Sequence, residues 1–118
     1  MKQSLVASKE TKGGVNIFSA VLEGVSPDIV KNIAFQLKGE FKENLFFVIG
    51  SVVEHKPNLT VMLSDDLVKK GMHAGNIIRN AAKHIQGGGG GQPNFAMAGG
   101  KNAEGLQKAV DEVLKSLS

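Results

Sequence analysis

Apolar and polar positions follow one another along the chain in a strand–helix–strand order. Residues 15–22 (VNIFSAVL) and 45–53 (LFFVIGSVV) are apolar runs rich in β-branched and aromatic side chains, which is typical of strands. Between them, apolar residues recur at helical spacing over 29–37, behind a helix start at Ser26 and Pro27. A helix that joins two strands in this way predicts that the strands are parallel.

The later part of the chain predicts a third strand and two more long helices. Residues 59–63 (LTVML) follow the second strand after a short link that contains Pro57, so these two strands are expected to pair antiparallel. Apolar residues one helical turn apart predict a helix over 73–86 and another from Asn102 onward. The predicted fold is α/β: a single domain with a small mixed β-sheet packed by helices, and a glycine-rich loop before the last helix.

The composition is consistent with one domain and limits its chemistry. A chain of 118 residues, 42% hydrophobic and 21% charged, is ordinary for a single globular domain. We assign residues 15–118 to that domain, and the polar residues 1–14 to a flexible lead-in or the stump of a preceding helical segment. The chain has no cysteine, so it has no disulfide and no thiolate metal site. No apolar stretch approaches the length of a membrane span, and we expect a cytoplasmic protein.

The most unusual feature is a glycine-rich segment between the last two predicted helices. Seven of the fourteen residues from Gly87 to Gly100 are glycine. Glycine adopts positive φ and allows close backbone approach, so one prediction is a nest of backbone N–H groups around an anion, beside Lys101. The alternative is a flexible surface linker. ATP and NAD are not expected to bind there, because the segment follows a helix and lacks the Walker and dinucleotide patterns.

The helix predicted over 73–86 has a polar face. Asn76, Arg79, Asn80 and Lys83 gather on it, and cations and amides at helical spacing can contact successive phosphates and sugar hydroxyls. A solvated helix face has the same pattern, so both interpretations stay open. The formal net charge of +3 is only a mild bias toward polyanions.

The aromatic residues divide between the core and the glycine-rich segment. Phe95 lies within the segment, where it either stacks on a base or plugs the segment onto the domain. The other phenylalanines are expected in the core: Phe18, Phe35, Phe41, Phe46 and Phe47.

No set of residues predicts catalysis or a metal site. His55, His73 and His84 lack metal-ligand spacing, and we expect them to be partly exposed and hydrogen-bonded. Asp65 and Asp66 fit the first turn of a short helix, where acidic side chains complement the helix dipole.

The glycine-rich segment, GGGGGQPNFAMAGGKN over residues 87–102, resembles the motif GGGGGRPDMAQAGGKD of the C-terminal domain of alanyl-tRNA synthetases. That domain is part of the wider family of domains associated with DHH phosphoesterases. The segment keeps the family's glycines together with Pro93, Ala96, Ala98 and Lys101. It departs at Gln92 and Asn94, where the family has Arg and Asp, and at Phe95 and Met97, where the family has Met and Gln. The likeness extends from Val15 to the end of the chain.

The resemblance implies a non-catalytic domain that binds tRNA-Ala at its outer corner, supports tRNA aminoacylation and, in many relatives, forms a homodimer. The chain would then be a piece of a longer ligase, whose other parts would bind ATP and zinc, and this domain would need no cofactor. The residues expected to contact tRNA are Arg79, Lys83, Gly89, Gly90, Gly91, Gln92, Asn94, Phe95, Gly99, Gly100 and Lys101. We expect Arg79, Lys83 and Lys101 to form one continuous cationic surface.

Two other functions remain open at this point. The chain could be the substrate-binding domain of a DHH-type phosphoesterase, although those relatives tend to carry a histidine in the glycine motif and this segment has none. It could also be a pure dimerisation module without affinity for nucleic acid. An exposed apolar patch would favour that function over RNA binding.

Overall fold

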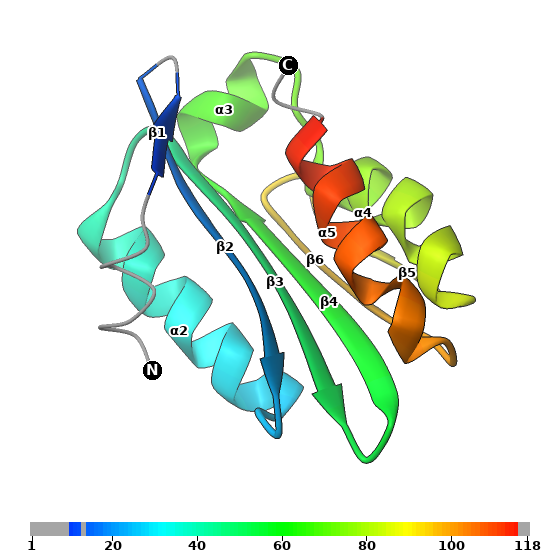
Figure 1. Cartoon of the computed structure of the whole chain (residues 1–118). Coiled ribbons are helices and arrows are strands. Elements are labelled where there is room, and N and C mark those ends of the chain that lie inside the picture. Colours follow the sequence, from blue (N-terminus) through cyan, green and yellow to red (C-terminus); the bar gives the residue numbers. More distant parts are fainter. Residues whose placement is uncertain (1–9, 13, 116–118) are drawn as a thin grey trace.

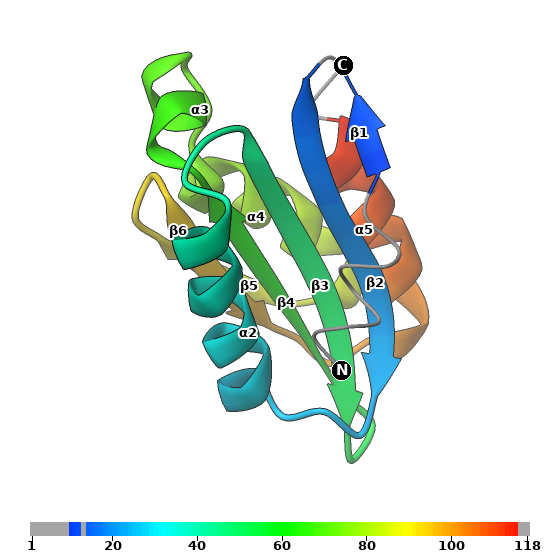
Figure 2. The ribbon, with the colours of Figure 1, turned by 90° about the vertical axis from the view of Figure 1, so that its left-hand side faces the viewer.

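The computed structural model describes residues 10–12 and 14–115, which form a β-sheet between two layers of helices (Figures 1 and 2). The strands are β1 (Glu10–Lys12), β2 (Val15–Glu23), β3 (Leu45–Val53), β4 (Lys56–Leu63), β5 (Gly88–Gly91) and β6 (Phe95–Gly99). In this described part of the chain they form one six-stranded sheet in the order β1-β2-β3-β4-β6-β5. β2 and β3 run parallel, and the other neighbouring pairs are antiparallel. The predicted mixed sheet, its parallel pair and the β3–β4 hairpin are confirmed.

The helices are divided between the two faces of the sheet. They are α2 (Pro27–Glu40), α3 (Asp65–Lys69), α4 (Ala74–Ala82), α5 (Leu106–Lys115) and the short 3-10 helices η1 (Lys83–Ile85) and η2 (Ala103–Gly105). α2 covers one face, whereas α4 and α5 cover the other (Figure 2). None of the described helices is long and apolar enough to cross a membrane.

Local chemistry explains where α2 begins and which side it buries. The Ser26 hydroxyl accepts a hydrogen bond from the Ile29 N–H at 3.5 Å, and Pro27 occupies the first turn, where a missing N–H costs nothing. The buried residues of α2 are Val30, Ile33, Ala34 and Leu37. They belong to the same core as Phe18, Phe47 and Met62, which confirms the predicted amphipathic helix.

The strand β3 has apolar side chains on both faces because both faces are covered. Phe46 and Val48 face the core beneath α4 and α5, whereas Phe47 and Ile49 face α2. Successive side chains of a strand point to opposite faces, so a strand between two helical layers has no polar side. This explains the continuous apolar run in the sequence.

Residues 10–12 correct the prediction of a lead-in that extends to residue 14. They form the edge strand β1, which pairs antiparallel with the start of β2 through Glu10 and Ile17. Main-chain hydrogen bonds hold an edge strand, so it can form without the apolar alternation that marks the other strands. Residues 1–9 of the predicted lead-in lie outside the described residues.

Asp66 in the first turn of α3 ties that helix to the start of β3. Its carboxylate oxygens accept hydrogen bonds from the Asn44 N–H at 3.1 and 2.9 Å. Burial acts to raise the pKa of Asp66, but hydrogen bonds from the Ser64 side chain and backbone N–H groups, with Lys70 nearby, bring that pKa below its ordinary value. The contact therefore stabilises the fold at neutral pH, and the stabilisation is lost as acid protonates the carboxylate.

Candidate nucleic-acid interface

The glycine-rich segment forms a β-hairpin, which corrects the prediction of a loop. β5 and β6, with the turn between them, lie at the edge of the sheet and are called the glycine hairpin below (Figure 1). Gly89 pairs with Ala98, and the turn is closed by a hydrogen bond from the Gln92 N–H to the Phe95 carbonyl at 2.8 Å. A strand made of glycine has no side chains and therefore no apolar periodicity, so its sequence does not distinguish it from a linker.

Close approach to β6 and the residue after it explains every second glycine of the run 87–91. A Cβ atom would lie 2.0 Å from the Gly99 oxygen if added at Gly87, and 2.4 Å from the Met97 oxygen if added at Gly89. Such distances are too short for any real contact. By contrast, a Cβ at Gly88 would meet nothing within 4 Å. No glycine of the hairpin has a positive φ, so the segment uses the small size of glycine and not its left-handed conformation.

No anion nest forms beside Lys101, because the backbone donors at that end of the segment have protein partners. The Gly100 N–H donates to the Pro57 carbonyl at 3.1 Å. The N–H groups of Lys101 and Asn102 both donate to the Ile85 carbonyl, at 2.8 and 2.9 Å. These hydrogen bonds fix the connection from β6 to η2 and leave none of the three donors for a phosphate.

The turn of the glycine hairpin is fastened to the rest of the domain. The Pro93 carbonyl accepts from the Ala74 N–H at 2.7 Å, and the Asn94 carbonyl accepts from the Leu63 N–H at 2.8 Å. Phe95 is half-buried, and its ring packs against that of Phe35 on α2, with the two ring centroids 5.2 Å apart. Of the two roles predicted for Phe95, this contact supports the plug. Phe35 itself is 47% exposed, so the prediction that it lies in the core was wrong. It packs on the Phe95 ring from the solvent side.

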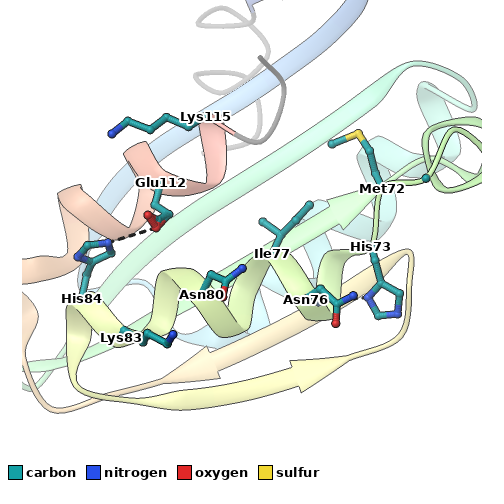
Figure 3. Close-up of a pocket in the computed structure, with 10 residues that line it drawn as sticks. Met72, His73, Asn76, Ile77, Asn80, Lys83, His84, Glu112 and Lys115 are labelled. Atoms are coloured by element: carbon teal, nitrogen blue, oxygen red, sulfur yellow. Dashed lines mark hydrogen bonds and ion pairs between the residues drawn. The ribbon is translucent and has the colours of Figure 1, made fainter.

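The polar face of α4 is divided between two neighbours. Arg79 lies along the glycine hairpin, where its Nε is 3.5 Å from the Cβ position of Gly90. Asn76, Asn80 and Lys83 instead line a groove between α4 and α5 (Figure 3). A helical pattern gives the angle of a side chain but not the element beside it, so this division was not predicted.

Lys83 and Lys101, two cations of the predicted continuous surface, line different hollows, and the continuity of that surface stays a prediction. Lys101 lines a separate hollow of about 510 Å³ with Lys56, Asn58 and Gln86, and none of its lining residues is shared with the groove that contains Lys83. The predicted contact residues therefore fall into three places: the glycine hairpin with Arg79, the α4–α5 groove, and the hollow at Lys101. Whether any of them touches RNA stays a prediction.

The groove, called the α4–α5 groove below, has a volume of about 850 Å³. Its lining residues are Gly71, Met72, His73, Asn76, Ile77, Asn80, Lys83, His84, Glu112 and Lys115. Sequence analysis did not single out Met72, Glu112 or Lys115. The last two lie on α5, far along the chain from α4, and no motif links the two helices.

The two histidines of the α4–α5 groove have hydrogen-bond partners, as predicted. His73 caps α4: its Nδ1 accepts from the Asn76 N–H at 3.1 Å, so the ring proton of the neutral form is on Nε2. The Nε2 of His84 lies 3.4 Å from Oε2 of Glu112, and both side chains are more than one-third exposed. Among the described residues, no three His, Asp or Glu side chains come close enough to hold a metal ion.

Comparison with known proteins identifies the family. Residues 14–118 match the DHHA1 domain. The chain belongs to the DHHA1 domain family. It is also similar to alanine–tRNA ligases: that of Bacteroides fragilis is 53% identical over 115 residues, and that of Bacteroides thetaiotaomicron is 54% identical over 117. Both matches cover 98% of this chain but only 13% of the relative. The chain thus spans about an eighth of the length of these ligases.

Solved structures show the same relationship. The C-Ala domain from Aquifex aeolicus alanyl-tRNA synthetase superposes with a TM-score of 0.79 and 29% identity, covering 92% of this chain and 96% of that one. A DHH-domain protein described as a member of a family of ribosomal proteins superposes with a TM-score of 0.63, covering 98% of this chain and 29% of that one. Its identity is 13%, so that likeness concerns the fold alone. The predicted resemblance to the C-terminal domain of alanyl-tRNA synthetases is confirmed.

Proposed function

We propose that this DHHA1 domain is a tRNA-binding accessory part of an alanine–tRNA ligase and that it holds tRNA-Ala at its outer corner without taking part in catalysis. The observation that carries the proposal is the likeness to the C-Ala domain, which includes nearly the whole of both chains. The similarity to alanine–tRNA ligases of two Bacteroides species supports the same parent enzyme.

The surface chemistry of α4 and its neighbours supports contact with a polyanion. Arg79, Lys83 and Lys101 are all exposed. Arg79 lies on α4 beside the glycine hairpin, Lys83 begins η1, and Lys101 follows the end of β6. Cations that can reach phosphates supply most of the affinity of non-specific RNA binding. Because Lys83 and Lys101 line separate hollows, the proposed contact is a set of phosphate contacts spread over one side of the domain.

Activation of alanine with ATP, its transfer to tRNA and any zinc chemistry are proposed to lie in other parts of the ligase. The domain is proposed to need no cofactor of its own and to act in the cytoplasm, where tRNA is charged. Pure protein should therefore show no ATP–pyrophosphate exchange and no deacylation of alanyl-tRNA. Formation of alanyl-adenylate by the 118-residue chain would contradict this part of the proposal.

A homodimer is the second candidate function. It is favoured by the large apolar side chains exposed on α2, Ile29 at 49% and Phe35 at 47%. These lie on the face of the sheet opposite to α4, so a dimer through α2 leaves the cationic side accessible (Figure 2). Sedimentation velocity of wild-type protein and of the Ile29→Ser variant would test it, because loss of a dimer in the variant alone assigns α2 to the contact.

Binding of tRNA-Ala across a salt series tests the main proposal. The logarithm of the affinity should fall linearly with the logarithm of the salt concentration, and other tRNA species should compete almost equally well. Filter binding or fluorescence anisotropy with the pure chain provides the affinity. No detectable binding at low salt, or an affinity that salt does not change, would refute a tRNA-binding role.

A further inference from the structure

We infer that the α4–α5 groove binds one unstacked nucleotide of an RNA, whose base edge is contacted by the side chains of Asn76 and Asn80. This inference deepens the proposed function, because it names the part of the domain that contacts a base. The other proposed contacts are to phosphates. The inference rests on the shape of the groove, on its exposed amides and on the distribution of charge around them.

The size and lining of the groove suit a nucleotide. Its volume of about 850 Å³ lies within the usual range of about 300–1,000 Å³ for small-molecule sites. Met72 and Ile77 are half-buried and give it an apolar surface on which the face of a base can rest. Polar side chains from α4 and α5 surround this surface (Figure 3).

The amides of Asn76 and Asn80 have no side-chain hydrogen bond to any described residue, and both residues are exposed. They lie four residues apart, so they are neighbours along one side of α4. An asparagine side chain offers one acceptor and two donors, which match the mixed donor and acceptor edge of a base. A face that served phosphate alone would be expected to carry cations at these positions.

The charged side chains of the groove lie together at the end away from His73, with Glu112 between Lys115 and His84 (Figure 3). Lys83 and Lys115 can each meet a phosphate oxygen. Glu112, the one acidic residue among those that line the groove, lies beside His84 and repels phosphate from that wall. A carboxylate oxygen can accept a hydrogen bond from a ribose 2′-hydroxyl, which deoxyribose lacks.

A titration with nucleoside monophosphates tests the inference without depending on tRNA. We expect millimolar CMP, AMP, GMP or UMP to shift the side-chain NH₂ resonances of Asn76 and Asn80 in the NMR spectrum of the full chain. The double variant Asn76→Ala and Asn80→Ala should bind the preferred nucleotide about tenfold more weakly, as expected when a base-edge contact is lost. Asn32→Ala is the matched control, because Asn32 is an exposed asparagine on α2, on the other face of the sheet.

Three outcomes would overturn the inference: no shift at either asparagine, equal nucleotide binding by the double variant, or tighter groove binding by an acidic peptide such as hexaglutamate. Each can be separated from failure of the proposed function, which is measured by the salt series with tRNA-Ala. If wild-type protein binds tRNA and the groove ignores nucleotides, only the present inference fails. If the groove binds nucleotides but tRNA does not bind at any salt concentration, the tRNA-binding role fails.

Discussion

The glycine hairpin and the α4–α5 groove both adjoin α4, yet they differ in the chemical groups that they offer to a ligand. In the hairpin, β6 is paired on both sides, with β4 and β5, the turn is bonded to Ala74 and Leu63, and alternate glycines have no room for a side chain. In the groove, exposed amides and cations project from a helix whose backbone is already satisfied. The segment that is most unusual in sequence therefore builds the scaffold, and an ordinary amphipathic helix supplies the groups that a ligand can use.

The hairpin nevertheless determines where the groove lies, because α4 rests directly on it. A Cβ at Gly75, in the first turn of α4, would lie 2.8 Å from the Gly91 carbonyl oxygen. The Ala74 N–H also donates to the carbonyl of Pro93 in the turn of the hairpin. The start of α4 is thus held against β5 by contacts that only small residues allow. Changes in the hairpin should act on stability, and changes in the groove should act on binding.

The largest effect is expected for Gly89→Ala. The added Cβ would lie 2.4 Å from the Met97 oxygen and 2.5 Å from the Ala98 Cα, so β5 must move away from β6. We expect the free energy of unfolding to fall by about 3 kcal/mol, the upper part of the usual range for overpacking. Urea denaturation followed by circular dichroism measures this change.

Gly88→Ala is the matched control for Gly89→Ala, since its Cβ would meet nothing within 4 Å. Its stability should stay within about 0.5 kcal/mol of wild type. Gly99→Ala should also be tolerated, because the nearest atom to its Cβ, Oδ1 of Asn58, is 3.6 Å away. Equal destabilisation by all three variants would mean that β5 and β6 are not as close as the structure shows.

A smaller loss of stability is expected for Phe95→Ala. Its ring is half-buried and contacts Phe35, so removal should cost about 2 kcal/mol, less than a fully buried phenylalanine. Affinity for tRNA should stay the same once measurements are made where the variant is folded. A wild-type melting temperature together with weakened tRNA binding would instead assign Phe95 to base stacking.

The comparison also shows what could be predicted from the sequence. The strands β2 and β3 and the helix α2 were predicted because dense apolar runs and the Ser26–Pro27 start encode them locally. β5 was missed because glycine carries no pattern. Phe35 was placed in the core because it is aromatic and lies in an amphipathic segment, although its position on the helix is off the buried stripe of α2.

The site was predicted less well, because it depends on contacts between distant segments. The sequence pattern puts four residues on one polar face: Asn76, Arg79, Asn80 and Lys83. In the structure Arg79 lies beside the glycine hairpin, whereas the other three line the groove with α5. Glu112 joins that groove only because α5 packs beside α4. No local signal in the sequence could have placed its charge there.

In the groove, Lys83→Ala should change RNA binding and leave the fold intact. An exposed helix position alters stability by under about 0.5 kcal/mol, whereas loss of one phosphate contact lowers the salt slope of tRNA binding by about one unit. Lys31→Ala is the matched control, since Lys31 is an exposed lysine on α2, across the sheet from the groove. The same slope for both variants would show that only net charge matters and that Lys83 makes no contact.

The smallest effect is expected for Glu112→Gln, and it has the opposite sign. The substitution removes the one negative charge that lines the α4–α5 groove but keeps an oxygen that can accept a hydrogen bond. A unit charge several ångströms from a phosphate in water is worth about 0.5 kcal/mol, so tRNA affinity should rise about twofold at low salt, and less at high salt. The exposed ion pair with His84 is worth little, and stability should change by less than about 0.5 kcal/mol. Glu23→Gln makes the same change of net charge outside the groove and should raise affinity less. If the two variants bind tRNA equally, the carboxylate of Glu112 does not face the bound RNA, and the strand must pass elsewhere on the domain.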